Sequence, residues 1–300
     1  MSAVIDDSGT KFTDGAPGKA QRWGQERRLE FIDFRLLWDG RINRGQLVDF
    51  FGISTQQASF DLSIYASLAP NNLSYNKSQK AYLVGDQFKP LLTPFDAQSL
   101  LSQLWGVTAG ILPTTMSFLG FRPSCDVVQF PARKIDPHSL INIIWAIRDH
   151  QKIHVTYQSM RRPEAGRRWI APHAIGFDGS RWHARAWCYE NNAFRDFVLT
   201  RIQAIHETES SDIDECLDKR WNTYVDVILC PRSDLTTAQR NAVALEFGMD
   251  KGTLSVRIRE ALVYYLVRQL QLDQQDHSVT RAYPIEWVNR SELISIVMEA

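Results

Sequence analysis

The feature that most constrains this chain is a close succession of apolar stripes at helical spacing across residues 26–65. Asn43 can cap the second of these short helices, and Gly52 and Ile53 then form a tight turn. Ser54, followed by Gln57, has the capping-box spacing for a third helix. Helices joined by such short turns predict a compact helical domain.

A polar hairpin is predicted directly after the third helix. Leu73–Tyr75 and Ala81–Val84 are short β-prone segments, and they flank the polar, basic residues 76–80. The order helix, helix, turn, helix and hairpin predicts a winged helix-turn-helix over residues 26–95. In that fold the third helix enters the major groove of double-stranded DNA, and the hairpin contacts the flanking backbone.

DNA recognition by such a domain needs two kinds of side chain. Gln can pair bidentately with adenine and Ser or Thr can bond to several base edges, whereas Arg and Lys contact phosphates. The candidates for the bases are Ser54, Thr55, Gln56, Gln57, Ser59 and Ser63, and those for the phosphates are Arg27, Arg28, Arg41, Arg44, Lys77 and Lys80. Winged helices also serve as protein-interaction modules and the charge of this segment is nearly balanced, so a protein adaptor is an alternative.

The rest of the chain divides by composition. Residues 1–25 are polar and lack periodicity, which predicts a flexible tail. Residues 96–135 predict a linker helix and an irregular connector, residues 136–208 a β domain, and residues 209–300 a small α+β domain.

The predicted β domain is rich in arginine. Residues 133–207 carry twelve Lys or Arg against seven Asp or Glu, although the whole chain has a net charge of zero. Arginines interleave with aromatic residues there, which suits a planar, phosphorylated ligand or a nucleic-acid segment. A barrel with an aromatic core and solvated arginines is the alternative. The strand-like runs are residues 153–159, 167–176, 182–190 and 194–200, which indicate a small antiparallel barrel.

Three segments of this region carry a family resemblance. P-H-A-I-G at 172–176, R-W-H-A-R-A-W-C at 181–188 and F-R-D-F-V-L-T-R-I at 194–202 resemble the core of the WYL domain of bacterial transcription regulators. The domain order is similar to that of the BrxR and CapW-like repressors of phage-defence operons, and the resemblance covers nearly everything after residue 25. The name-giving Trp-Tyr-Leu triplet is here Trp182-His183-Ala184.

The resemblance implies a fold and a ligand. The fold class is an α+β multidomain protein with an N-terminal winged helix-turn-helix, a central Sm-like (SH3-like) β-barrel and a C-terminal α+β dimerisation domain of the WCX type. The implied effector is a nucleotide or a nucleic-acid fragment. The ligand-binding residues implied by position are Tyr157, Ser159, His173, Trp182, His183, Arg185, Arg195 and Arg201.

No catalytic or metal-binding motif is found. The chain has no nucleophile elbow, P-loop or H-E-x-x-H, and its four cysteines form no C-x-x-C pair, so we expect no enzyme, cofactor or metal. No apolar run approaches the length of a membrane span, so we expect a cytoplasmic protein without a membrane partner. A nucleic-acid-processing enzyme with a basic substrate-binding barrel is the alternative.

Dimerisation follows from the DNA-binding hypothesis, because one winged helix contacts only one half-site. The apolar residues Leu262, Tyr265, Leu266 and Leu270 are either a dimer contact or part of a core. We therefore expect a homodimeric repressor of its own operon that binds an inverted-repeat operator, with ligand binding in the β domain shifting the DNA-binding heads.

Overall fold

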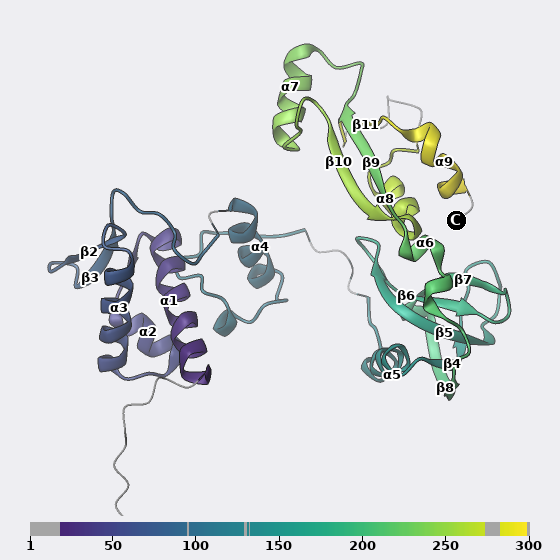
Figure 1. The fold of residues 1–300 in the computed structure, drawn as a ribbon, viewed down its shortest axis with the longest axis horizontal. Coiled ribbons are helices and arrows are strands. Elements are labelled where there is room, and N and C mark those ends of the chain that lie inside the picture. The colour runs from purple at the N-terminus through teal and green to yellow at the C-terminus, as the bar shows by residue number, and fades with distance from the viewer. Residues whose placement is uncertain (1–18, 95, 129–130, 132, 274–282, 299–300) are drawn as a thin grey trace, which may run out of the picture. The chain divides into compact units, whose positions relative to one another are not determined.

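A computed structural model describes residues 19–94, 96–128, 131, 133–273 and 283–298 (Figure 1). The chain forms two compact units, Met1–Gln129 and Phe130–Ala300. In the part that the structure describes, no helix is both long and apolar enough to cross a membrane.

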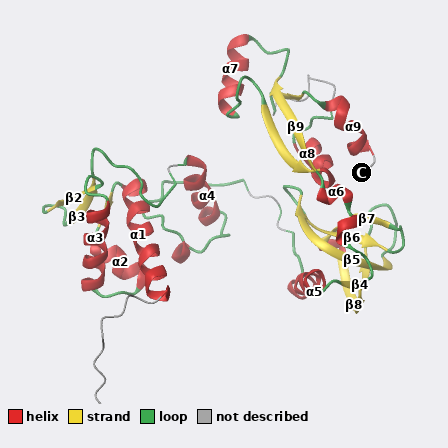
Figure 2. Ribbon diagram, viewed as in Figure 1, coloured by secondary structure: helices red, strands yellow, loops and turns green. Residues whose placement is uncertain are grey.

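The N-terminal unit is a helical domain with a small sheet (Figure 2). The third strand lies at the centre of that sheet, whose order is β1-β3-β2, so the hairpin is anchored to the chain between the first two helices. The winged helix-turn-helix predicted from the order of elements is confirmed as an architecture. Its elements are α1 (Lys19–Asp39), β1 (Arg41–Ile42), α2 (Arg44–Phe51), α3 (Thr55–Leu68), β2 (Leu73–Asn76) and β3 (Ala81–Val84).

Two details of these helices differ from the prediction. Helix α1 begins at Lys19, so residues 19–25 are helical rather than part of a tail, while residues 1–18 lie outside the described residues. Ser54 caps α3 by accepting from the Gln57 backbone N–H, but the Gln57 side chain does not return to the cap. It donates instead to Asp61, so the predicted capping box is only half formed. Asn43 forms a complete capping box on α2.

The segment after the wing packs back onto the N-terminal helices. The buried Asp33 carboxylate on α1 accepts hydrogen bonds from the backbone N–H groups of residues 91–93, at 2.7–3.1 Å. Phe118 lies beyond α4 (Ala97–Thr108), and its ring packs edge-on against Phe31 of α1 at 5.2 Å. Residues of the predicted connector therefore belong to the core of the N-terminal unit.

The second unit begins with an antiparallel sheet of order β7-β6-β5-β4-β8. Helix α5 (Pro137–Arg148) covers one face, where Ile143 and Ala146 pack among the buried residues of the sheet (Figure 1). Among the described residues no ladder joins the edge strands β7 and β8, so the predicted closed Sm-like barrel is not observed. The strands are β4 (Gln151–Tyr157), β5 (Gly166–Phe177), β6 (Trp182–Cys188), β7 (Ala193–Val198) and β8 (Ile202–Ser210), the last of which the sequence did not predict.

The C-terminal module is the predicted small α+β unit. Its sheet has the order β10-β9-β11, and the partly buried Leu266 and Leu270 pack against its core. Strand β11 and helix α9 were not predicted. The elements are α6 (Lys219–Asn222), β9 (Tyr224–Pro231), α7 (Thr237–Glu246), β10 (Leu254–Arg259), α8 (Val263–Gln269), β11 (Ile285–Trp287) and α9 (Arg290–Met298).

Candidate functional site

Helix α3 has a buried side and an exposed side. Ala58, Leu62 and Tyr65 are fully buried against α1 and α2, because these positions repeat at helical spacing. The opposite side faces solvent and carries the predicted base-contacting residues Thr55, Gln56 and Ser63. Phe60 and Ser67 are exposed on the same side, and sequence reasoning had not included them.

Two predicted DNA-binding residues are engaged inside the domain instead. Arg28 Nε lies 2.6 Å from Asp61 Oδ2, and the Gln57 side-chain amide donates to Asp61 Oδ1 at 3.0 Å. Asp61 is fully buried, and a buried carboxylate without such partners would be strongly destabilising. Arg28 therefore ties α1 to α3, and Gln57 satisfies the same carboxylate from within α3.

The serine hydroxyls of α3 are partly engaged. Ser59 donates to the Thr55 carbonyl at 2.9 Å, and Ser63 donates to the Ser59 carbonyl at 2.9 Å. The Arg44 guanidinium donates to Ser59 Oγ at 3.4 Å. A hydroxyl that donates to its own helix still has lone pairs to accept from a base amino group. Ser54 is exposed as the cap of the helix.

The N-terminal unit carries exposed basic side chains on several elements. Arg41 and Arg44 are exposed next to β1 and at the start of α2, and Lys77 and Lys80 are exposed at the tip of the wing. Arg27 is also exposed, but it pairs with a neighbouring carboxylate on α1 at 2.6 Å. Within the described residues, the other four basic side chains form no ion pair, so their charges are free to contact phosphates.

A cavity of about 510 Å³ opens in the second unit between the five-stranded sheet and the C-terminal module. Five of the predicted ligand-binding residues line it: Tyr157, Ser159, Arg185, Arg195 and Arg201. Arg161, Arg162 and Arg168 line the same cavity; they belong to the arginine-rich region that the sequence indicated, but were not among the ligand-binding residues implied by position. Sequence reasoning did not place Arg220, Tyr264 and Tyr265 at this site. Arg220 and the two tyrosines belong to the C-terminal module, and no periodicity relates them to the β domain.

The other three predicted ligand-binding residues do not line this cavity. Trp182 packs against Phe177 with ring centroids 4.7 Å apart, and His183 Nε2 lies 2.9 Å from Asp178 Oδ2. Burial alone would raise the pKa of Asp178, but the hydrogen bonds from His183 and from the backbone of the β5–β6 turn lower it to about 2. His173 Nε2 lies 3.0 Å from Asp218 Oδ2. All three side chains therefore have partners within the protein, and those of His173 and His183 lie behind the cavity wall, since Asp218 pairs with Arg185 and the His183 ring packs against Tyr265 at 5.1 Å.

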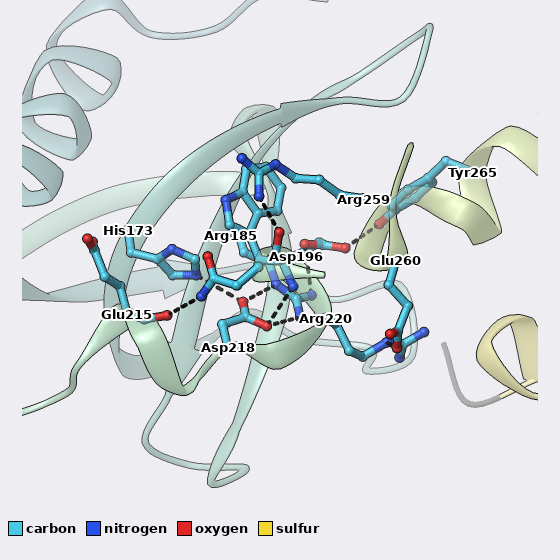
Figure 3. Close-up of polar contacts among 11 residues, drawn as sticks. His173, Arg185, Asp196, Glu215, Asp218, Arg220, Arg259, Glu260 and Tyr265 are labelled. Carbon is cyan, nitrogen blue, oxygen red and sulfur yellow. Dashed lines mark hydrogen bonds and ion pairs between the residues drawn. The ribbon is translucent and has the colours of Figure 1, made fainter. Parts of the chain in front are cut away.

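Arg185 is the centre of a buried polar network at the wall of the cavity (Figure 3). Its Nε and Nη2 donate to the Asp218 carboxylate at 2.7 and 3.0 Å, and its Nη1 donates to Asp196 at 3.2 Å. The Tyr265 hydroxyl donates to the other oxygen of Asp196 at 2.9 Å. Strands β6 and β7 are thus tied to α8 and to the start of α6.

The pKa of the Asp218 carboxyl reflects this network. Burial acts to raise it, but the hydrogen bonds from His173 and Arg185 outweigh burial and hold the pKa well below its usual range. For Tyr265, burial and the neighbouring Asp196 carboxylate both raise the pKa of the phenol. Asp218 is therefore charged and Tyr265 neutral at physiological pH.

Arg168 has hydrogen-bonding capacity that the protein does not use. The side chain is only 7% exposed, and its Nη1 pairs with Glu190 at 3.0 Å. Its Nε and Nη2 have no hydrogen-bond partner among the described residues. Arg161, Arg195 and Arg201 line the same cavity, and none of them forms an ion pair within the described ranges. Buried, unpaired guanidinium donors favour an anionic ligand with several acceptor oxygens.

No group of three or more His, Cys, Asp or Glu side chains that could hold a metal ion occurs within the described residues.

Three domain families match the chain in the order of the described domains. Residues 24–106 match the BrxR transcriptional regulator winged helix-turn-helix domain, residues 138–207 the WYL domain, and residues 224–293 the BrxR C-terminal dimerization domain. A DNA-binding transcriptional repressor CapW from Stenotrophomonas maltophilia is 44% identical over 253 residues, which cover 84% of this chain and 85% of that protein. The chain belongs to the BrxR/CapW family.

Further members of the BrxR/CapW family match along nearly the whole chain. The CapW repressor of Escherichia coli (strain KTE188) is 39% identical over 93% of both chains. The CapW repressor of Pseudomonas aeruginosa is 40% identical over 96% of this chain and 98% of its own length. Helix α3 lies inside the matched winged helix-turn-helix domain, and Tyr264 and Tyr265 lie inside the matched dimerization domain.

One solved structure is similar along much of the chain. Proteasome accessory factor B/C (PafBC) of Arthrobacter aurescens is 18% identical and aligns with 91% of this chain, which spans 45% of that longer chain. Its TM-score of 0.26 is too low to support any conclusion about the fold.

Proposed function

We propose that this chain is a homodimeric transcriptional repressor that binds an inverted repeat in double-stranded DNA and releases it when an anionic ligand occupies the arginine-lined cavity. The observation that carries the DNA-binding half is the exposed polar face of α3 beside the unpaired lysines of the wing. The relatives are named DNA-binding transcriptional repressors, which supports the same role.

A dimer is part of the proposal because one α3 helix reads only one half-site. The match of residues 224–293 to a dimerization domain supports the C-terminal module as the contact between subunits. Two winged helices related by a two-fold axis require an operator with the same symmetry. In this proposal the regulator acts without catalysis, and the naming of its relatives as transcriptional repressors supports that role.

The DNA-binding half is tested with duplex DNA from upstream of the protein's own coding sequence, compared with scrambled DNA of equal length in a gel shift. Gln56→Ala should abolish selective binding, because Gln56 is exposed on α3 and can pair with a base edge. The matched control is Arg240→Ala, which removes an exposed arginine from α7 of the other unit. Equal retention of both duplexes by the wild-type protein would refute a sequence-specific repressor.

The ligand-binding half rests on the cavity's guanidinium groups. Arg161, Arg195 and Arg201 supply positive charge, Arg168 supplies buried unpaired donors, and Tyr264 supplies an aromatic ring on the module side. A phosphate group suits the four arginines, and a planar base suits the tyrosine ring. The proposed ligand is therefore a nucleotide or a short nucleic-acid fragment.

The probe for this half is a short, fluorescently labelled single-stranded oligonucleotide. We expect wild-type protein to bind the probe and to release operator DNA as the probe is added, because a ligand that prefers the DNA-free conformation must lower DNA affinity. Arg195→Ala should weaken probe binding and leave operator binding unchanged, since Arg195 is exposed and holds no other side chain in the described structure. A probe that binds wild type and Arg195→Ala equally would place the ligand elsewhere.

A further inference from the structure

Phe60 interrupts an otherwise polar surface on α3. Its side chain is 58% exposed, whereas Ala58, Leu62 and Tyr65 on the opposite side of the same helix are fully buried. Gln56 precedes it by four residues, so the two side chains lie one above the other on the exposed side. Phe60 therefore stands at the centre of the surface that the proposed function presents to DNA.

The Phe60 ring is not part of the aromatic packing of the described N-terminal unit. Three other phenylalanines of the helical domain, Phe31, Phe50 and Phe51, pack against one another with centroids 4.7–5.3 Å apart. Phe60 takes part in no such ring pair within the described residues and lies outside the hydrophobic core. Exposing an aromatic side chain sacrifices the stabilisation that its burial would provide.

The major groove offers an apolar ring one specific partner. Base edges there present hydrogen-bond donors and acceptors, and the only apolar group among them is the C5-methyl of thymine. Along the helix axis, Gln56 and Phe60 are about 6 Å apart, at 1.5 Å per residue. That separation corresponds to about two base-pair steps of 3.4 Å.

We propose that Phe60 reads a thymine methyl group in each operator half-site, one or two base pairs from the base contacted by Gln56. The inference rests on the proposed DNA-binding function and deepens it, because it names a specificity-determining residue and the base that this residue selects. It also explains why a large apolar side chain is exposed on the reading face of α3.

The test removes the methyl group rather than the protein side chain. Footprinting on the upstream duplex first defines the two protected half-sites. Each thymine in them is then replaced by deoxyuridine, symmetrically in both half-sites, and the affinity is measured by fluorescence anisotropy. Deoxyuridine keeps the Watson–Crick pairing and lacks only the C5-methyl, so the change isolates the apolar contact.

One symmetric replacement should weaken wild-type binding by about fourfold per half-site, the equivalent of one buried methyl group. Phe60→Ala should bind the unmodified operator more weakly and should no longer distinguish thymine from deoxyuridine at that position. Leu68→Ala is the matched control, since Leu68 is 56% exposed on the same helix but points away from the Gln56 side. It should keep both the affinity and the sensitivity of wild type.

Each outcome decides the matter. If wild type binds selectively but tolerates deoxyuridine at every position, Phe60 does not read a thymine methyl, and the inference is wrong while the repressor function stands. If Phe60→Ala keeps the deoxyuridine sensitivity of wild type, another residue makes the contact. If no duplex is bound selectively, the proposed function itself fails, and this inference fails with it.

Discussion

Asp218→Asn should destabilise the second unit strongly, because Asp218 joins the β domain to the C-terminal module. Its side chain is 2% exposed and accepts from Arg185 at 2.7 and 3.0 Å, and from the Trp221 backbone N–H at 3.2 Å. An asparagine keeps the shape of the side chain but removes the charge opposite the Arg185 guanidinium. It also turns an amide N–H₂ toward groups that are themselves donors.

The expected loss of stability depends on the ion pair that Arg185 retains in the variant. Breaking a buried ion pair by removing one partner costs about 3–5 kcal/mol. Arg185 still has the Asp196 carboxylate at 3.2 Å, so the cost should fall at the lower end, about 3 kcal/mol. Asp226→Asn is the matched control, because Asp226 is exposed on β9 and its substitution should cost less than about 0.5 kcal/mol.

Urea unfolding of the full chain, combined with hydrogen exchange of individual peptides, measures this loss and locates it. Because the two units can unfold separately, the fluorescence transition alone would mix their stabilities. Peptides covering β6 and α6 should exchange faster in Asp218→Asn, whereas peptides of α1 and α3 should be unchanged. If Asp218→Asn lost as little stability as Asp226→Asn, the central role of the Arg185 network would be refuted.

Three further predictions concern other parts of the molecule. Asp178 has a pKa of about 2 in the folded protein, below its unfolded value, so its charged form contributes on the order of 2 kcal/mol to the free energy of unfolding. This contribution is complete above about pH 4 and is lost as the pH falls toward 2. Acid unfolding of Asp178→Asn should therefore lack this loss of stability. Lys77→Ala with Lys80→Ala removes two phosphate contacts from each subunit of the proposed dimer, so it should reduce the slope of log affinity against log salt by nearly four, measured by anisotropy. An unchanged slope would show that the wing does not contact the phosphates. Gly85→Ala should cost more than about 2 kcal/mol in thermal unfolding, because the added Cβ overlaps the Asn71 backbone, and a stable variant would contradict this close approach.

The sequence predicted well where a residue's partner lies only a few positions away. Asn43 and Ser54 were identified as helix caps, because a cap satisfies backbone N–H groups within the next turn. Gln57 shows the limit of such reasoning. Its spacing suited both a capping box and base recognition, but the buried Asp61 carboxylate binds its amide, and burial cannot be read from local spacing.

Only the β-domain residues of the candidate cavity were predicted from the sequence. The family resemblance identified Arg185, Arg195 and Arg201 on the β domain. Arg220 and Tyr264 complete the cavity from a module whose position relative to the sheet no local pattern encodes. Likewise, the resemblance implied that His183 binds the ligand, but its partner Asp178 could be identified only in the three-dimensional structure.

Strand β8 was missed because its side chains look like a loop. Its second half is Glu207-Thr208-Glu209-Ser210, which is exposed and lacks the alternation of a half-buried strand. The backbone of β4 recruits it through a ladder from Gln151 to Tyr157. Backbone pairing of this kind leaves little trace in the hydrophobic pattern.

That same strand has a consequence for the behaviour of the protein at high concentration. In the described structure β8 pairs only with β4, so its outer row of N–H and C=O groups could template the addition of strands from other chains. Two irregularities interrupt its pairing with β4, and its exposed end carries Glu207 and Glu209. Local distortion and repeated negative charge are features that oppose edge-to-edge aggregation. The sheet can thus remain open without joining further chains, which suits the proposed dimer, whose subunits associate through the C-terminal module.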